Sequence, residues 1–145
     1  MKNIRKKFAV VLVLLVSLSY LNVVSGESYN ETPTYEPIII IGDDNFTPEN
    51  GVIGGSGTKE DPYIIANWVI KANGTAPYDM GTVGIFIANT TKYFVIRNVT
   101  VFGGDWGILL DNVSNFVIED SKFYDINWYA IVAGGVIQGL SLIHI

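Results

Sequence analysis

The 145-residue chain carries 9 basic and 14 acidic side chains, a formal net charge of −5, and it contains no cysteine. The absence of cysteine excludes disulfide cross-links, thiolate metal ligands and a cysteine nucleophile. An apolar fraction of 49% with only 16% charged residues excludes a disordered chain, and the length suits one domain.

Residues 1–26 have the features of a secretory signal peptide. Basic residues precede the apolar run FAVVLVLLVSLSYLNVV, and the small residues Ser25 and Gly26 follow it. The alternative is an N-terminal membrane anchor, but the uninterrupted apolar part is shorter than the roughly 20 residues of a spanning helix. We therefore expect a secreted or cell-surface protein that has no membrane association once the signal is cleaved.

The chain that remains after residue 26 is strongly acidic. It keeps five basic residues against fourteen acidic residues, a net charge of −9. Such a surface repels phosphate groups, which argues against nucleic acid and against anionic lipid as partners.

The segments before the repeats are rich in polar and turn-forming residues. Residues 27–37, ESYNETPTYEP, are expected to be a flexible spacer between the export signal and the domain. The run IIII at 38–41 predicts a short buried strand. The stretch 42–62 is dense in Gly, Asp, Asn and Pro, which predicts irregular structure.

A repeat follows, first visible in GIFIAN at 84–89 and again in GILLDN at 107–112. The pattern fades at its third occurrence, around Ile131. A second element, centred on Phe94, recurs at Phe116 after nearly the same length of chain. Apolar residues alternate with polar ones in short runs, which is the period of β-strands.

The second element also occurs earlier in the chain, at Tyr63. The interval from Tyr63 to Phe94 is longer than the interval from Phe94 to Phe116. The extra residues match an insertion at 73–81, which interrupts an otherwise constant spacing. We therefore expect residues 38–135 to form one repeating domain.

Short strands repeated with a period of about 22–23 residues predict an all-β fold, the parallel β-helix, of about three to four coils. In such a solenoid, equivalent strands stack about 4.8 Å apart and bury one another's inward faces. Ile85 is then expected to lie over Ile108, and Phe94 over Phe116. The alternatives are a leucine-rich repeat, which requires a helical element that the chain lacks, and a β-sandwich, which does not explain the constant spacing.

Asparagine and aspartate are expected at two corners of each coil, because they tolerate left-handed backbone conformations. Asn89 and Asn112 are predicted to form a ladder of amide hydrogen bonds at one corner. The second corner is predicted to hold Asn67, Asn98 and Asp120.

The end of the chain departs from the repeat. Residues 136–145, which end in SLIHI, fit no coil, and we expect an irregular or non-native tail. A stack that stops there leaves an open β edge. We therefore expect the β-helix to be truncated at its C-terminus and the chain to be the N-terminal fragment of a longer protein.

Residues 38–135 also resemble a known family. The entry segment GDDNFTPENGVIGGSGTKEDPYIIANWVI and the coils YFVIRNV and GILLDNV are similar to secreted archaeal proteins of the NosD-like group, whose coils are described as carbohydrate-binding and sugar-hydrolase (CASH) repeats. The resemblance implies a right-handed parallel β-helix. It implies no particular activity, because this fold hosts several functions. Copper, which the family name invokes, needs His, Cys or Met ligands, and the chain between signal and tail offers only Met80.

Aromatic residues provide the candidate binding site. Trp106 and Trp128 are one repeat apart and are predicted to stack at one corner, with Tyr129 beside the second. Aromatic rings on an outer face offer flat apolar surfaces to the CH groups of sugars. The two tryptophans and the nearby Asp105 are therefore the predicted ligand contacts. The alternative is that the rings cover a hydrophobic groove beneath a loop.

The acidic residues are not expected to form a catalytic site. Hydrolysis of a polysaccharide needs paired carboxylates, and elimination needs calcium-binding acids with a basic residue. The candidates are Asp105, Asp111, Glu119 and Asp120, together with Arg97. Arg97 and Glu119 fall at equivalent repeat positions, and charges on the outer face of a sheet are ordinarily structural. We therefore assign no catalytic residue.

Loop residues offer one candidate metal site and two candidate modification sites. The stretch 42–45, GDDN, with Glu60 and Asp61 could supply oxygen ligands to calcium, but it lacks the regular spacing of a calcium loop, and a solvated turn is the alternative. No other cofactor is expected. Among the Asn-X-Ser/Thr sequons, Asn30 and Asn73 lie in loops and are the predicted glycosylation sites.

The predicted function is binding of polysaccharide or cell-envelope glycan by an outer face of the β-helix, without catalysis in this chain. Two alternatives stay open. The chain is the N-terminal part of a polysaccharide lyase or glycoside hydrolase whose active site lies on further coils, or it is a structural module of a surface layer or adhesin.

Overall fold

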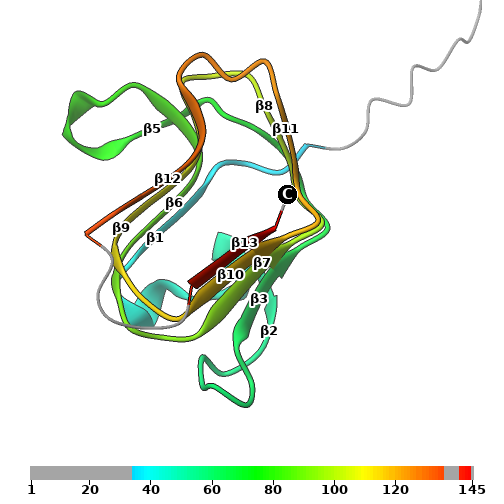
Figure 1. The fold of residues 1–145 in the computed structure, drawn as a ribbon, viewed down its shortest axis with the longest axis vertical. Helices are drawn as coiled ribbons and strands as arrows, with labels where there is room; N and C mark the ends of the chain where they lie inside the picture. The colour runs from blue at the N-terminus through cyan, green and yellow to red at the C-terminus, as the bar shows by residue number, and fades with distance from the viewer. Residues whose placement is uncertain (1–33, 136–140, 145) are drawn as a thin grey trace, which may run out of the picture. The chain divides into compact units, whose positions relative to one another are not determined.

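A computed structural model describes residues 34–135 and 141–144. These residues form an all-β structure joined by turns and short 3-10 helices (Figure 1). The strands are β1 (Ile38–Ile41), β2 (Val52–Gly54), β3 (Tyr63–Ala66), β4 (Val69–Lys71), β5 (Gly74–Thr75), β6 (Thr82–Thr90), β7 (Phe94–Arg97), β8 (Thr100–Phe102), β9 (Trp106–Val113), β10 (Phe116–Glu119), β11 (Lys122–Tyr124), β12 (Tyr129–Gly134) and β13 (Ser141–His144). The helices are η1 (Asp43–Asn45), η2 (Pro48–Asn50) and η3 (Pro77–Asp79). The predicted signal peptide at 1–26 and the sequon at Asn30 lie outside the described residues.

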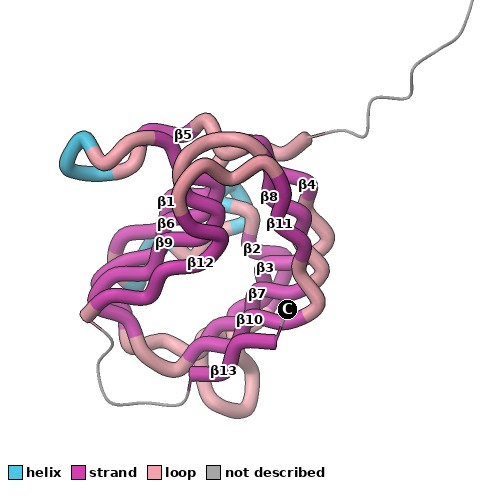
Figure 2. The backbone as a smooth tube through the Cα atoms, turned by 45° about the horizontal axis from the view of Figure 1, so that its top comes forward, coloured by secondary structure: helices cyan, strands magenta, loops and turns pink. Residues whose placement is uncertain are grey.

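The strands pair into three mainly parallel sheets. The first sheet has the order β1-β6-β9-β12 with β5 beside β6, the second has the order β13-β10-β7-β3-β2, and the third has the order β11-β8-β4. The short strands β5 and β2 pair antiparallel with β6 and β3. From β6 to β13 the chain visits the first, second and third sheets in a constant cycle, so successive turns of the chain lie side by side (Figure 2).

The register places equivalent repeat positions beside one another, as the spacing predicts. Ile85 pairs with Ile108, and Ile108 pairs with Ile131, in parallel strands of the first sheet. In the second sheet Phe94 pairs with Phe116, and their ring centroids are 5.8 Å apart. Residues that recur at a constant spacing in the sequence are therefore register partners in neighbouring parallel strands.

The main core combines buried residues from all three sheets. Its largest fully buried side chains are Phe94, Phe116, Leu110 and a set of isoleucines that includes Ile85. Burial of each such side chain contributes about 1.5–3 kcal/mol relative to exposure. The β-branched residues fit the pleated surface of a strand. Because successive side chains of a strand point to opposite faces, their alternation with polar residues determines which face of each short strand points into this core.

A second, smaller core lies on the first sheet. Phe86 and Leu109 are register partners that belong to it, whereas their chain neighbours Ile85 and Ile108 belong to the main core. Ala76, from the insertion at 73–81, is also buried in the second core. The first sheet is therefore apolar on both faces, which explains why its strands do not alternate strictly between apolar and polar residues.

Asparagine side chains connect successive repeats at two turns. Asn112 Nδ2 donates a hydrogen bond to Asn89 Oδ1 at 2.8 Å, and Asn98 Nδ2 donates to Asn67 Oδ1 at 2.9 Å. These four residues and Asp120 have φ values between 49° and 65°. Asparagine and aspartate tolerate this left-handed region better than other residues with a Cβ, so the same positions serve both the turn and the link between repeats.

The N-terminal part of the domain differs from the prediction. Tyr35 lies within the predicted spacer 27–37, yet its backbone pairs with Ile70 and its ring stacks on Trp68 with centroids 4.1 Å apart. The spacer prediction is therefore corrected at Tyr35, because a large aromatic surface gains from packing. The prediction of irregular structure over 42–62 is corrected at β2, whose residues pair with β3 although turn formers flank them.

The tail that was predicted to be irregular over 136–145 contains a strand. Within it, β13 pairs in parallel with β10, with Ser141 opposite Phe116. The step from Phe116 to Ser141 is longer than the step from Phe94 to Phe116, so the segment does not match the repeat in the sequence. The pairing satisfies backbone N–H and C=O groups at the edge of β10, and this gain does not require the regular spacing.

Candidate functional site

Three aromatic side chains, here termed the aromatic cluster, gather where β9 and β12 begin: Trp106, Trp128 and Tyr129. Trp106 and Tyr129 are register partners, with ring centroids 5.7 Å apart and ring planes 23° apart. Trp128 meets Trp106 edge to face, with centroids 5.2 Å apart and an interplanar angle of 85°, so the predicted stacking of the two tryptophans is corrected: Tyr129 is the ring that stacks on Trp106. Trp128 is 54% exposed and Tyr129 is 61% exposed, so both present ring surface to solvent.

Trp106 forms the base of the aromatic cluster. Its ring is partly buried and packs against the second core. Its indole Nε1 donates a hydrogen bond to the backbone oxygen of Met80 at 2.5 Å. That oxygen belongs to the loop that carries β5, the short strand that pairs with the start of β6 (Figure 1). Because packing and a hydrogen bond both hold Trp106, the two exposed rings rest on an ordered support.

Asp105 organises the turn before β9. Its Oδ2 accepts hydrogen bonds from the backbone N–H of Thr82 at 2.9 Å and from the Thr82 hydroxyl at 3.1 Å, and its Oδ1 accepts from Asn127 Nδ2 at 3.1 Å. Its backbone oxygen accepts from the backbone N–H groups of Trp128 at 3.0 Å and Tyr129 at 3.3 Å. The sequence predicts Asp105 as a ligand contact. In the structure both carboxylate oxygens have protein partners, which makes Asp105 a positioning residue for the exposed rings.

The acid stability of the protein is expected to depend on Asp105. The hydrogen bond from the backbone of Thr82, followed by the one from Asn127, lowers the pKa of this carboxyl group. A carboxylate with a lowered pKa stabilises the fold above its unfolded value of about 3.9 and loses this contribution as the pH falls through the folded pKa. When the pH is lowered from neutral to below about pH 4, we therefore expect the melting temperature of Asp105→Asn to fall less than that of the wild type. Melting temperatures followed by circular dichroism from neutral to acidic pH test this, and equal losses in the two proteins would contradict it.

The insertion at 73–81 borders the aromatic cluster and adds an exposed ring that the sequence analysis missed. Tyr78, on η3, is 85% exposed and has a φ of 61°. The only signal in the sequence was the interruption of a constant period, and such interruptions mark surface loops, where binding residues are common.

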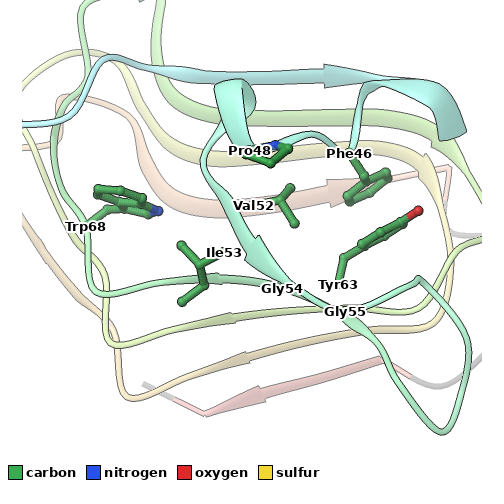
Figure 3. A pocket seen from close by; sticks show the side chains of 8 residues that line it. All are labelled: Phe46, Pro48, Val52, Ile53, Gly54, Gly55, Tyr63 and Trp68. Atoms are coloured by element: carbon green, nitrogen blue, oxygen red, sulfur yellow. The ribbon is translucent and has the colours of Figure 1, made fainter.

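A separate apolar pocket of about 440 Å³ lies beside the edge strand β2 (Figure 3). Trp68 lies on one side of Val52 and Ile53, and Phe46 and Tyr63 lie on the other. The indole Nε1 of Trp68 donates to a backbone oxygen, that of Gly51, at 2.9 Å. The lining includes no carboxylate, lysine, arginine or histidine, so the pocket offers mainly apolar contacts. The sequence did not reveal it, because most of its wall comes from 42–62.

The remaining candidate residues are spread over several elements. Asp111 lies on β9 in the first sheet, whereas Glu119 ends β10 in the second sheet. Arg97 is the register partner of Glu119, as the repeat predicts. Asn73 is exposed at the start of the insertion, and its glycosylation stays a prediction.

Two of the residues proposed as calcium ligands form side-chain hydrogen bonds within the protein. Asp43 Oδ1 accepts from the hydroxyl of Thr90 at 2.6 Å, and Asn45 Nδ2 donates to the backbone oxygen of Ile41 at 2.6 Å. Across residues 34–135 and 141–144, no three or more His, Cys, Asp or Glu side chains are grouped so that they could hold a metal ion. The geometry of the described loops therefore gives the calcium prediction no support.

The sequence matches no protein-family model, and comparisons with curated proteins and with solved structures give no significant match. In the part of the chain that the structure describes, no helix is long and apolar enough to cross a membrane.

Proposed function

We propose that the chain folds as a right-handed parallel β-helix. The constant cycle through three sheets, with parallel register at a nearly constant step along the chain, supports this proposal. The path from β6 through β7 and β8 to β9 joins parallel strands of one sheet, and such connections are right-handed in about 98% of cases. The resemblance of residues 38–135 to NosD-like repeats agrees with the same fold.

We propose further that this module binds polysaccharide or cell-envelope glycan at the aromatic cluster, without catalysis. The observation that carries the proposal is that two large rings, Trp128 and Tyr129, are more than half exposed while the ring that supports them is fixed. Exposed aromatic surface costs solvation free energy unless a ligand covers it, and the CH faces of sugars fit such rings. Export through residues 1–26 belongs to the proposal, because it would bring the cluster to the side of the membrane where envelope glycans lie.

Trp128→Ala is expected to weaken glycan binding at least about tenfold while leaving the fold intact, because a central aromatic contact commonly contributes about 2 kcal/mol or more. Binding is first screened on an array of immobilised plant, fungal and bacterial polysaccharides, and the hits are then measured by affinity electrophoresis. The matched control is Ile53→Ala, which removes a side chain that is 51% exposed on β2, outside the aromatic cluster. Equal retardation of the wild type and both variants would show that the aromatic cluster is not the binding site. Absence of binding to any polysaccharide would contradict the proposed function.

A further inference from the structure

The angles between the rings restrict the shape of the ligand. The plane of Tyr129 lies within 23° of the plane of Trp106, whereas Trp128 stands at 85° to Trp106. The two exposed rings are therefore steeply inclined to each other. A flat crystalline polysaccharide presents its sugar faces in a single plane and can cover only one of these rings. A single chain can bend or twist so that successive sugars stack on both.

The charges around the aromatic cluster restrict the chemistry of the ligand. The three segments that hold or border the rings are 77–81, 103–107 and 125–130, and none of them contains Lys, Arg or His. Each contains one aspartate, namely Asp79, Asp105 or Asp125. These segments therefore offer a carboxylate or sulfate on a glycan no cationic side chain to pair with, and their aspartates oppose its approach by like-charge repulsion.

We infer that the aromatic cluster selects a single, uncharged glycan chain over crystalline polysaccharide and over acidic polysaccharide. This inference rests on the proposed function and adds a substrate class to it. The inclined rings exclude the flat surface, and the aspartates exclude the anionic chain.

The test compares three kinds of probe. Affinity electrophoresis with the soluble neutral polymers hydroxyethyl cellulose, glucomannan and laminarin should retard the protein, and this retardation should disappear in Trp128→Ala. Polygalacturonate and alginate should bind at least about tenfold more weakly than the best neutral polymer. Sedimentation with microcrystalline cellulose and with chitin should leave the protein in solution.

A variant with fewer aspartates distinguishes charge repulsion from poor steric fit as the cause of weak binding to acidic polysaccharide. The double variant Asp79→Asn with Asp125→Asn keeps residues that tolerate positive φ, and both positions have a φ of 55°. It should gain at least about threefold in affinity for alginate at low salt and keep its affinity for neutral polymers. The matched control Asp44→Asn, at an exposed position on η1, should change neither affinity.

Each outcome decides between the two proposals. Binding to a crystalline or acidic probe that equals or exceeds binding to neutral chains, and that depends on Trp128, would overturn this inference and leave the proposed function standing. Unchanged alginate affinity in the double variant would overturn the role given to the aspartates. Retention by none of the probes and by no array polysaccharide would remove the proposed function and this inference with it.

Discussion

Replacement of Phe94 by alanine is expected to lower the free energy of unfolding by about 3–5 kcal/mol. Phe94 is only 1% exposed, and its ring centroid lies 5.8 Å from that of Phe116 and 5.7 Å from that of Phe46. Truncation therefore removes the middle ring of three. Phe116 cannot move far to fill the space, because strand pairing between β7 and β10 sets its position, so most of the cavity should persist.

Chemical denaturation followed by circular dichroism measures this loss. The matched control is Tyr78→Ala, which removes another aromatic ring, but one that is 85% exposed. Its cost should stay within about 0.5 kcal/mol, as for most surface substitutions. If Phe94→Ala lost as little unfolding free energy as the control, the stacked rings would not be a main source of the core's stability.

Gly104→Ala is expected to cost about 1–3 kcal/mol more than Gly103→Ala, although the two glycines are adjacent. Both have positive φ values, 83° at Gly104 and 67° at Gly103, so alanine at either position is held in a left-handed backbone conformation. The difference lies in the space around the added methyl group. At Gly104 a Cβ would overlap the backbone oxygen of Ala72, whereas at Gly103 it would meet nothing within 4 Å.

The comparison isolates close approach between neighbouring turns of the chain. Ala72 follows β4 and Gly104 follows β8, and these strands are partners in the third sheet. Urea unfolding of the two variants gives the difference directly, because their backbone penalties nearly cancel. Equal losses would mean that the turns can separate without cost. A larger loss for Gly103→Ala would reverse the assignment of the tight contact.

The repeat made much of the register predictable from the sequence. Three register pairs agree with the spacing of the repeats: Ile85 with Ile108, Phe94 with Phe116, and Arg97 with Glu119. These pairings follow from the sequence because each turn has nearly the same length of chain, so equivalent residues arrive at equivalent positions. The all-β class follows in the same way from the alternation of apolar and polar residues.

Segments outside the repeat could not be predicted in this way. Tyr35 stacks on Trp68, and β13 extends the second sheet after a longer step. Each gains stability by packing or pairing against a surface that exists only once the repeats have assembled. The pocket beside β2 has the same origin, because its walls come from segments that share no sequence pattern.

The sequence by itself determined the strands, their spacing and the recurrence of Trp106 and Trp128, because these depend on local alternation and on chain length between corners. Only the tertiary structure decided that Trp128 stands edge-on to Trp106 and that the carboxylate of Asp105 binds Thr82 and Asn127. Ring angles and hydrogen-bond partners depend on contacts between neighbouring turns and with the loop that carries β5. Such contacts arise from the packing of distant segments, which no spacing of residues along the chain encodes.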